Sequence, residues 1–323
     1  MCTAVSFHSH DHYFGRNLDL EQKFLETVTV TPRNFPFRFR HMPDMPTHYA
    51  MIGMASIVRN YPLYYEATNE KGLSMAGLNF PGYATYYPFR EEKENITPFE
   101  LIPWILGQCS NVEEATEVLG RMNLLNEAFS PRLPLSPLHW IIADRKRSIT
   151  LETLPDGMRI YENPVGVLTN NPPFDYHMLH LADYMNISAG PCENRFAPNI
   201  DIKQYSRGMS TVGLPGDLGS ASRFVKAAFT KLNSKCDGTE SASVSQFFHI
   251  LASVAQQRGL VVHEGAYEIT YYSSCCNTDK GIYYYTTYEN RQITAVDMHH
   301  EDLEAVNLIS YPLVLDQQIR WEN

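Results

Sequence analysis

The chain has 323 residues, enough to bury a large core in either one domain or two. Its 26 basic and 36 acidic residues give a formal net charge of −10, and the basic residues form no long run, which argues against a nucleic-acid surface and against binding to anionic lipid. Hydrophobic residues make up 44% of the chain, and its 20 Tyr and 16 Phe suit either an ordinary core or a pocket for flat, apolar ligands.

Targeting signals and cysteine usage both indicate an intracellular protein. The N-terminus has neither a basic region nor a long apolar stretch, and no segment approaches 18 uninterrupted apolar residues. We therefore expect no membrane span and a cytoplasmic location. The six cysteines are scattered without a CxxC pair, so we expect all of them to be reduced. Cys275 and Cys276 are adjacent on a predicted strand and point to opposite faces, which argues against a shared metal.

Alternating apolar and polar residues predict that the chain begins with β-strands. Residues 2–7 and 13–18 form the arms of a hairpin around a turn at 9–12. Further strands are expected at 27–31, 49–58, 63–68 and 73–78. Thr97-Pro98-Phe99-Glu100 is typical of a helix start, because it combines an N-cap, a proline in the first turn and a capping-box glutamate. Ser110-Asn111-Val112-Glu113 repeats the capping box for a second helix.

The second half of the chain returns to strands, interrupted by two helices. The expected strands lie at 138–143, 148–154, 158–161 and 166–169, the helices at 221–232 and 243–257, and the final hairpin at 282–288 and 292–297. Strands and helices in separate blocks predict an α+β fold of stacked layers, with two sheets between helix layers. No internal repeat or low-complexity linker divides the sequence, so we predict a single domain over residues 1–323.

Cys2 is the first candidate for chemistry. Initiator methionine is normally removed before a small second residue, and removal of Met1 would leave a thiol and a free α-amine on one residue. Both groups titrate near pH 8 in model compounds, so the amine can act as the base for its own thiol near neutral pH. The alternative is that a cysteine at position two is incidental.

Five blocks of sequence decide between these alternatives, because together they resemble the choloylglycine hydrolase family. Met1-Cys2-Thr3 is followed by Phe14-Gly15-Arg16-Asn17-Leu18-Asp19, which is similar to the FGRNxD-type strand of that family. The later blocks are NEKGL at 69–73 with AGLNFP at 76–81, VLTNNP at 167–172, GLPGD at 213–217 with ASRF at 221–224, and KGIYYY at 280–285 with YEN at 288–290. They occur in family order and span nearly the whole chain.

The resemblance implies a fold, an assembly and a reaction. The fold is the four-layer αββα sandwich of the N-terminal-nucleophile hydrolase type, and the assembly is a homotetramer without cofactor or metal.

Two activities of the family fit, bile salt hydrolase and penicillin V acylase. Asn79 favours the first, because the family's penicillin-preferring members often have tyrosine at the corresponding position. The substrate would then be a bile acid conjugated to glycine or taurine. A third alternative, from another class, is a non-catalytic protein that binds amphipathic anions and retains Met1.

The resemblance also assigns the nucleophile and its neighbours. Cys2 attacks the amide carbonyl, and the guanidinium groups of Arg16 and Arg223 favour its thiolate. Asp19 accepts hydrogen bonds from the Cys2 amine and orients it. The product of the attack is a thioester acyl-enzyme, which water hydrolyses.

Two asparagines complete the expected catalytic set. Asn170 through its side-chain amide and Asn79 through its backbone N–H supply the oxyanion hole, and Asn79 also contacts substrate. Taken singly, each asparagine before a nearby proline could be a turn former. Arg16 and Asp19, three apart on a strand, could equally be a surface pair, and Arg223 on a helix could be solvated.

Two further patterns lie outside the catalytic set. His8, His10 and His12 alternate as metal ligands on a strand would, but the expected turn at 9–12 breaks that geometry.

Arg207 precedes the GLPGD block, in a loop that the resemblance places near the mouth of the site. Its guanidinium would pair bidentately with a planar carboxylate, so we expect a preference for glycine conjugates. The alternative is a solvated loop arginine.

Overall fold

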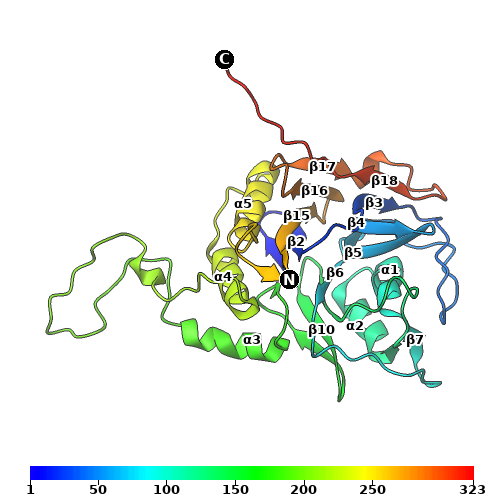
Figure 1. The fold of residues 1–323 in the computed structure, drawn as a ribbon, viewed down its shortest axis with the longest axis horizontal. Helices are drawn as coiled ribbons and strands as arrows, with labels where there is room; N and C mark the ends of the chain where they lie inside the picture. Colours follow the sequence, from blue (N-terminus) through cyan, green and yellow to red (C-terminus); the bar gives the residue numbers. More distant parts are fainter.

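Two antiparallel sheets lie face to face at the centre of the protein, as the computed structural model of residues 1–323 shows (Figure 1). The first sheet has six strands in the order β12-β1-β2-β15-β16-β17. Its strands are β1 (Cys2–His8), β2 (His12–Leu20), β12 (Val167–Leu168), β15 (Ile269–Asn277), β16 (Ile282–Thr287) and β17 (Thr294–Asp297). The sheet therefore joins the two ends of the chain around β1 and β2.

The second sheet has eight strands in the order β11-β10-β9-β6-β5-β4-β3-β18. Its strands are β3 (Thr27–Thr31), β4 (Met51–Val58), β5 (Tyr61–Asn69), β6 (Ser74–Asn79), β9 (Leu138–Ala143), β10 (Ser148–Leu154), β11 (Gly157–Glu162) and β18 (Ile309–Pro312). β6 contacts both β1 and β2 of the first sheet, so the middle of each sheet packs on the other. Short strands β7 (Glu94–Ile96) and β8 (Met122–Leu124) pair in parallel outside these sheets, and β13 (Val262–His263) pairs with β14 (Ala266–Tyr267).

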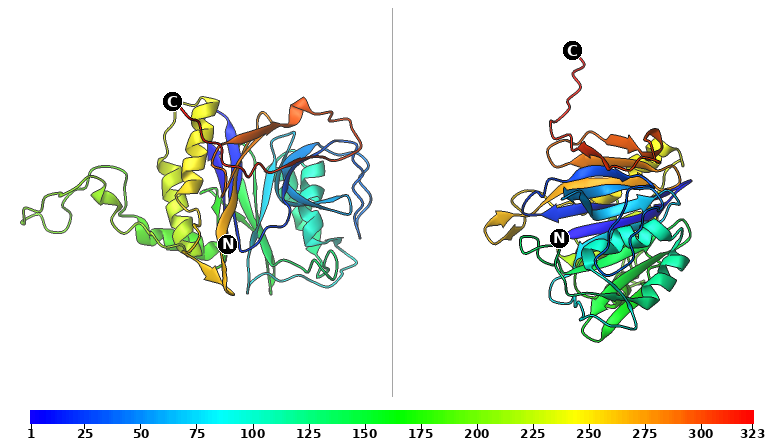
Figure 2. Two further views of the ribbon diagram at one scale, coloured as in Figure 1. Left: turned by 45° about the horizontal axis from the view of Figure 1, so that its top comes forward. Right: turned by 90° about the vertical axis from the view of Figure 1, so that its right-hand side faces the viewer.

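Helices cover the outer face of each sheet. Helices α4 (Ser220–Asn233) and α5 (Glu240–Ala252) pack on the six-stranded sheet. Helices α1 (Leu101–Gln108) and α2 (Val112–Arg121) lie on the other side of the stack, where α1 contacts β5 and β6 (Figure 2, left). One core cluster fills the space between the sheets and beneath α4 and α5, and a second lies beneath α1 and α2. This arrangement confirms the predicted α+β sandwich, and we retain the prediction that residues 1–323 form one domain.

Helix starts follow the local capping chemistry, with one correction. The Thr97 N–H donates to Glu100 Oε2 at 3.2 Å, and a single turn of 3₁₀ helix over Pro98–Glu100 leads into α1. The second cap is not the predicted Ser110 but Asn111, whose side chain accepts from the N–H of Glu114 at 3.0 Å. Asparagine is as good an N-cap as serine, so the helix starts one residue later.

Several elements differ from the sequence prediction. Helix α5 starts at Glu240, behind the Thr239 cap, and ends at Ala252 instead of 257. The reason is tertiary: Gln256 exchanges two hydrogen bonds with Thr270, from its N–H to Oγ1 at 2.7 Å and from the Thr270 N–H to its carbonyl at 3.1 Å. Helix α3 (Phe174–His180), the edge strand β18 and the short strands β7, β8, β13 and β14 were not predicted.

A long arm between α3 and α4 extends away from the body (Figure 1). It follows a 3₁₀ turn over Leu181–Tyr184 and runs to the start of α4 at Ser220. Large apolar side chains on it face solvent, with Phe196 86% and Tyr205 84% exposed. The C-terminal segment after β18 also leaves the body. None of the helices is both long and apolar enough to cross a membrane.

Candidate active site

Cys2 begins strand β1, directly opposite Leu18 of β2. Because side chains on paired strands share a face, Cys2 lies on the same face as Arg16, and this face packs on the eight-stranded sheet. Asp19 lies on the opposite face, toward the helices. Both Arg16 and Asp19 are fully buried, at 1% and 0% exposed, so the alternative of a surface pair is wrong.

Gly15 permits the close crossing that builds this part of the sheet. A Cβ at Gly15 would lie 2.0 Å from the carbonyl oxygen of Ser274 on β15, closer than any real contact. With glycine there, β15 approaches β2, and the Ser274 hydroxyl accepts a hydrogen bond from the Arg16 N–H at 3.1 Å. The FGRN segment therefore positions Arg16 through its glycine as well as its arginine.

The Arg16 guanidinium lies between the two sheets. Its Nη1 donates to the carbonyl oxygens of Tyr65, at 3.1 Å, and Gly77, at 2.5 Å. Burial alone would lower the pKa of Arg16, but its interactions with the Cys2 thiol, Tyr272 and Glu66 raise that pKa above its ordinary value. The guanidinium is thus a permanent positive charge beside the sulfur.

Glu66 on β5 faces Arg16 and was not expected from the sequence. Its Oε2 lies 3.9 Å from Arg16 Nε and accepts from the Tyr272 hydroxyl at 2.7 Å. Its Oε1 accepts from the hydroxyls of Ser274, at 3.0 Å, and Tyr283, at 2.5 Å. Burial raises the pKa of Glu66, while Arg16 and these three hydroxyls oppose the shift. A buried carboxylate held by this many donors fixes the position of the arginine beside it.

Asn170 lies beside the Cys2 backbone with a defined amide orientation. Its Oδ1 accepts from the Cys2 N–H at 2.8 Å and from Arg223 Nη2 at 2.7 Å, and both of these groups can only donate. Its Nδ2 must then face an acceptor, and it donates to the Asn79 carbonyl at 2.7 Å. The second hydrogen of Nδ2 remains for another acceptor.

Arg223, on the first turn of α4, is buried and reaches the same point. Its Nη1 donates to the Cys2 carbonyl at 2.6 Å and to Thr3 Oγ1 at 2.7 Å, and its Nε donates to the Leu218 carbonyl at 3.0 Å. Only 1% of the residue is exposed, so the alternative of a solvated helix arginine is wrong. Burial lowers the pKa of Arg223, and the negative charges of Asp19, Cys2 and Glu268 oppose that shift.

The N-terminus lies over Asp19 and Glu268. The Met1 amine donates to the Asp19 backbone carbonyl at 2.8 Å and pairs with Glu268 Oε1 at 2.9 Å. The Asp19 carboxyl accepts from the Thr270 hydroxyl at 2.6 Å through Oδ1, while its Oδ2 is buried without a hydrogen-bond partner. Burial raises the pKa of Asp19, and Arg223 and the N-terminal amine oppose the shift. With Met1 in place, the Cys2 nitrogen is an amide and contacts Asn170, not Asp19.

Two buried histidines, which sequence reasoning missed, hold the backbone of the Asn170 loop. His177 Nε2 lies 2.8 Å from the Asn170 carbonyl, and His139 Nε2 lies 2.9 Å from the Thr169 carbonyl. His139 Nδ1 in turn lies 3.0 Å from Glu152 Oε1. Burial lowers the pKa of His177 to about 4, so its imidazole is neutral and donates through Nε2. His177 belongs to α3, an element without a sequence signal.

The predicted residues are not all brought together. Cys2, Arg16, Asp19, Asn79, Asn170 and Arg223 form one connected cluster. Arg207 is exposed on the arm, which leads away from this cluster (Figure 1).

Comparisons with known proteins agree with this geometry. The family model "Linear amide C-N hydrolases, choloylglycine hydrolase family" matches residues 2–311. The chain is 56% identical over 319 residues to the bile salt hydrolase/transferase of Lactiplantibacillus plantarum, and the match covers 98% of each chain. It superposes on the crystal structure of the mutant C2A conjugated bile acid hydrolase from Clostridium perfringens with a TM-score of 0.93 and 36% identity over the whole of both chains.

A more distant likeness concerns the fold alone. Penicillin V acylase from Agrobacterium tumefaciens matches with a TM-score of 0.75 at 17% identity, covering 96% of this chain and 90% of that one. Together these matches confirm the predicted sandwich of the N-terminal-nucleophile hydrolase type. The chain therefore belongs to the choloylglycine hydrolase family of linear amide C–N hydrolases, and it is an amide-hydrolysing enzyme.

Proposed function

We propose that this protein is a bile salt hydrolase that cleaves the amide bond of bile acids conjugated to glycine or taurine. The observation that carries the proposal is the cluster around Cys2, in a chain 56% identical along almost its full length to a bile salt hydrolase/transferase. No cofactor is needed for this reaction, because the thiol, the amine and the hydrogen-bond donors all belong to the chain.

The reaction begins once Met1 is removed and the Cys2 nitrogen becomes an α-amine. The amine takes the thiol proton, and the sulfur, beside the Arg16 guanidinium, forms a bond to the amide carbonyl carbon. The C–N bond then breaks, the leaving glycine or taurine takes the proton from the amine, and a thioester remains. Water hydrolyses the thioester and restores the thiol.

Asp19 and the asparagines would serve this sequence in different ways. The unpaired Oδ2 of Asp19 is a buried acceptor that a freed Cys2 amine can satisfy, which supports the orienting role expected for it. The second hydrogen of Asn170 Nδ2 and the Asn79 N–H are the proposed donors to the oxyanion. The contact from Asn170 to the Asn79 carbonyl ties these two donors together.

Two measurements test the proposal. Intact mass of the purified protein should show loss of Met1, and side-by-side assays with glycocholate, taurocholate and penicillin V should show hydrolysis of the bile salts first. Cys2→Ser should lose nearly all turnover, whereas Cys192→Ser, on the arm, should retain it. Retention of Met1 in active protein, or full activity of Cys2→Ser, would refute the mechanism.

Penicillin V acylase is the second candidate. The solved acylase shares the fold at 17% identity, which carries no statement about substrate. Asn79, at the end of β6 beside the cluster, instead favours bile salts, as the sequence indicated. Faster hydrolysis of penicillin V than of both bile salts would decide for the acylase. A non-catalytic role would show as retained Met1 with no turnover of any of the three.

The expected homotetramer and the cytoplasmic location remain predictions. The exposed aromatic and aliphatic side chains on the arm support an assembly, because an isolated arm of this kind leaves apolar surface in water. Light scattering should give a mass of four chains. Deletion of the arm should reduce that mass, and a single-chain mass for the intact protein would contradict the proposal.

Arg207 is proposed to favour glycine conjugates through bidentate pairing with their carboxylate. Since the arm leads away from the body, this role requires the arm to bend back or to reach the site of a second subunit. The ratio of kcat/KM for glycocholate to that for taurocholate should fall toward one in Arg207→Ala. An unchanged ratio removes Arg207 from the account, and a wild-type preference for taurocholate refutes the selectivity itself.

A further inference from the structure

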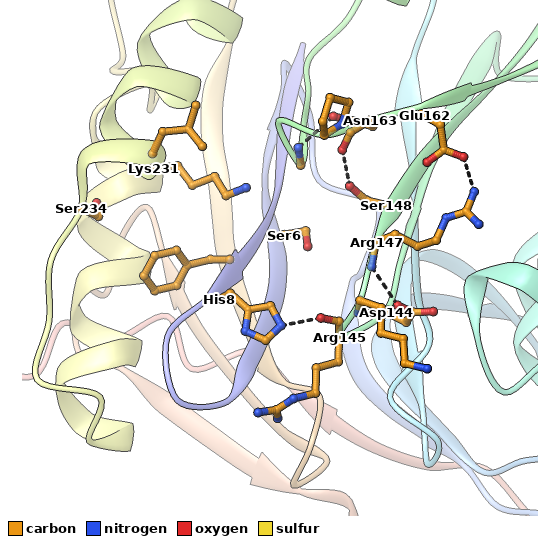
Figure 3. Close-up of a pocket in the computed structure, with 15 residues that line it drawn as sticks. Ser6, His8, Asp144, Arg145, Arg147, Ser148, Glu162, Asn163, Lys231 and Ser234 are labelled. Atoms are coloured by element: carbon orange, nitrogen blue, oxygen red, sulfur yellow. Dashed lines mark hydrogen bonds and ion pairs between the residues drawn. The ribbon is translucent and has the colours of Figure 1, made fainter. Parts of the chain in front are cut away.

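A polar cavity of about 560 Å³ lies at the opposite end of β1 from Cys2 (Figure 3). Its walls are the end of β1 with Ser6 and His8, the turn between β9 and β10, the segment after β11, and the last turn of α4. Only Phe7 and Leu232 among its fifteen lining residues are hydrophobic. From Cys2 to His8 the strand rises about 20 Å, so the cavity is separate from the catalytic cluster.

The charges on the cavity wall are predominantly positive. Four basic residues line it, Arg145, Lys146, Arg147 and Lys231, against two acidic ones, Asp144 and Glu162. This gives an excess of two positive charges, in a chain whose formal net charge is −10. In Figure 3 the labelled charged side chains come from three separate elements around one space, namely the turn between β9 and β10, the end of β11 and helix α4.

The acidic side chains have other partners. Asp144 accepts from the backbone N–H groups of Val112 and Lys146, both at 2.7 Å, and of Arg147 at 3.0 Å. Glu162 forms an ion pair with Arg147. Arg145 pairs with Asp279, outside the cavity wall, at 2.7 Å. Both arginines are thereby neutralised, and the ammonium groups of Lys146 and Lys231 have no ion-pair partner.

Lys231 is the group that most needs an anion. Its ammonium extends from α4 toward Ser6, and its Nζ hydrogen-bonds only the Val165 carbonyl, at 2.5 Å (Figure 3). An ammonium has three donors, so two remain available to a ligand. Burial lowers the pKa of Lys231 to about 8, the direction expected of a half-buried cation with no counter-ion. The Ser6 hydroxyl, 2.9 Å from His12 Nε2, adds a polar group to the floor.

We propose that this cavity is a binding site for a phosphate group, with Lys231 as its principal ligand and Lys146 as the second charge. A phosphate offers several oxygens to the free donors, and its negative charge is opposite to that of the two ammonium groups that have no ion-pair partner. The volume lies within the range of small-molecule sites and exceeds the needs of inorganic phosphate, so a small phosphomonoester also fits.

Calorimetry on the purified enzyme tests the site at constant ionic strength set with potassium chloride. Inorganic phosphate and glycerol 3-phosphate should each bind at one site per chain, and tighter binding of glycerol 3-phosphate would identify a phosphomonoester as the better ligand. Lys231→Met keeps the alkyl stem and should weaken binding about 10- to 100-fold, the loss expected for a charge-assisted hydrogen bond. Lys235→Met, an exposed lysine just beyond the same helix, should bind as the wild type.

Two further variants protect the test against misfolding. Lys231→Arg retains the charge and should bind within a few fold of the wild type, and Lys146→Met should weaken binding without disturbing the buried wall. Bile-salt hydrolysis reports that each variant is folded. Absence of saturable binding to the wild type, or equal binding by the wild type, Lys231→Met and Lys146→Met, would overturn the proposal.

Discussion

Arg223 Nη2 donates a 2.7 Å hydrogen bond to the Oδ1 of Asn170, the same oxygen that accepts the Cys2 N–H. The other terminal nitrogen of the guanidinium donates to the Cys2 carbonyl. One planar group therefore fixes the nucleophile's backbone and the amide beside it. A helix N-terminal turn, a strand end and a loop meet at this guanidinium, so its geometry sets their relative positions.

Replacement of Arg223 by lysine should therefore damage catalysis although the charge is retained. An ammonium cannot reach both oxygens in the fixed geometry of a guanidinium, so Asn170 should lose its orientation. We expect kcat to fall about 100-fold with KM nearly unchanged, measured with glycocholate. Ser222→Ala, at the neighbouring, partly exposed position, is the control and should retain kcat. A kcat within a few fold of wild type in Arg223→Lys would show that charge alone suffices.

Asn170→Ala tests the proposed oxyanion donor. Loss of one such donor typically lowers kcat on the order of 10²- to 10³-fold. The change should appear in kcat far more than in KM, because the amide acts on charge that develops after substrate is bound. Asn126→Ala, an exposed asparagine away from the cluster, should leave both constants as in the wild type. If the loss appears only in KM, Asn170 contributes to binding and the oxyanion assignment is wrong.

Sequence patterns predicted most of the fold because its strands are short runs of apolar and β-branched residues bounded by turns, although β9 and β10 are buried on both faces. Strands β3, β9 and β10 have the predicted bounds, at 27–31, 138–143 and 148–154. Helix α3 was missed because it has only seven residues and follows two prolines, and β18 because its last residue is Pro312. Both elements are stabilised by tertiary contacts that local pattern does not encode.

Because local pattern does not encode tertiary contacts, it also limited which site residues could be predicted from the sequence. Cys2, Arg16 and Asn170 lie in segments that resemble a family, whereas Glu66 has no such motif. Its role arises only when the Tyr272 hydroxyl, 206 positions along the chain, is brought to it by sheet packing. The available signal was a lone carboxylate within a predicted strand, beside residues expected to be buried.

Glu66→Gln should show whether this carboxylate positions Arg16. Removal of one partner from a buried ion pair leaves the other charge uncompensated, so the free energy of unfolding should fall by about 3 kcal/mol. Since Arg16 is then less firmly held beside Cys2, kcat should fall about 10-fold with little change in KM. Glu100→Gln, at a buried carboxylate that accepts from the Thr97 N–H ahead of α1, should lose stability but keep kcat. An unchanged kcat in Glu66→Gln would restrict the residue to a structural role.

The buried histidines make stability depend on pH. Burial is the main cause that lowers the pKa of His12 to about 3, and that of His177 to about 4, from an ordinary value of 6.5. Below pH 6.5 the unfolded chain binds protons that the folded chain does not, so stability is full above that value and is lost as pH falls toward the folded-state pKa. Between pH 7 and pH 5 each histidine should remove about 2 kcal/mol of the free energy of unfolding.

Comparison with His12→Gln isolates one histidine, because all other titrating groups are common to both proteins. Glutamine is neutral and polar, so it can still contact Ser6 and Thr278, the hydrogen-bond partners of His12. Denaturant unfolding at pH 7 and pH 5 should show the wild type losing about 2 kcal/mol more than the variant. His263→Gln, at an exposed position on β13, should follow the wild-type curve. Parallel pH profiles for the wild type and His12→Gln would mean that His12 accepts its proton in the folded protein as readily as in the unfolded chain, despite its burial.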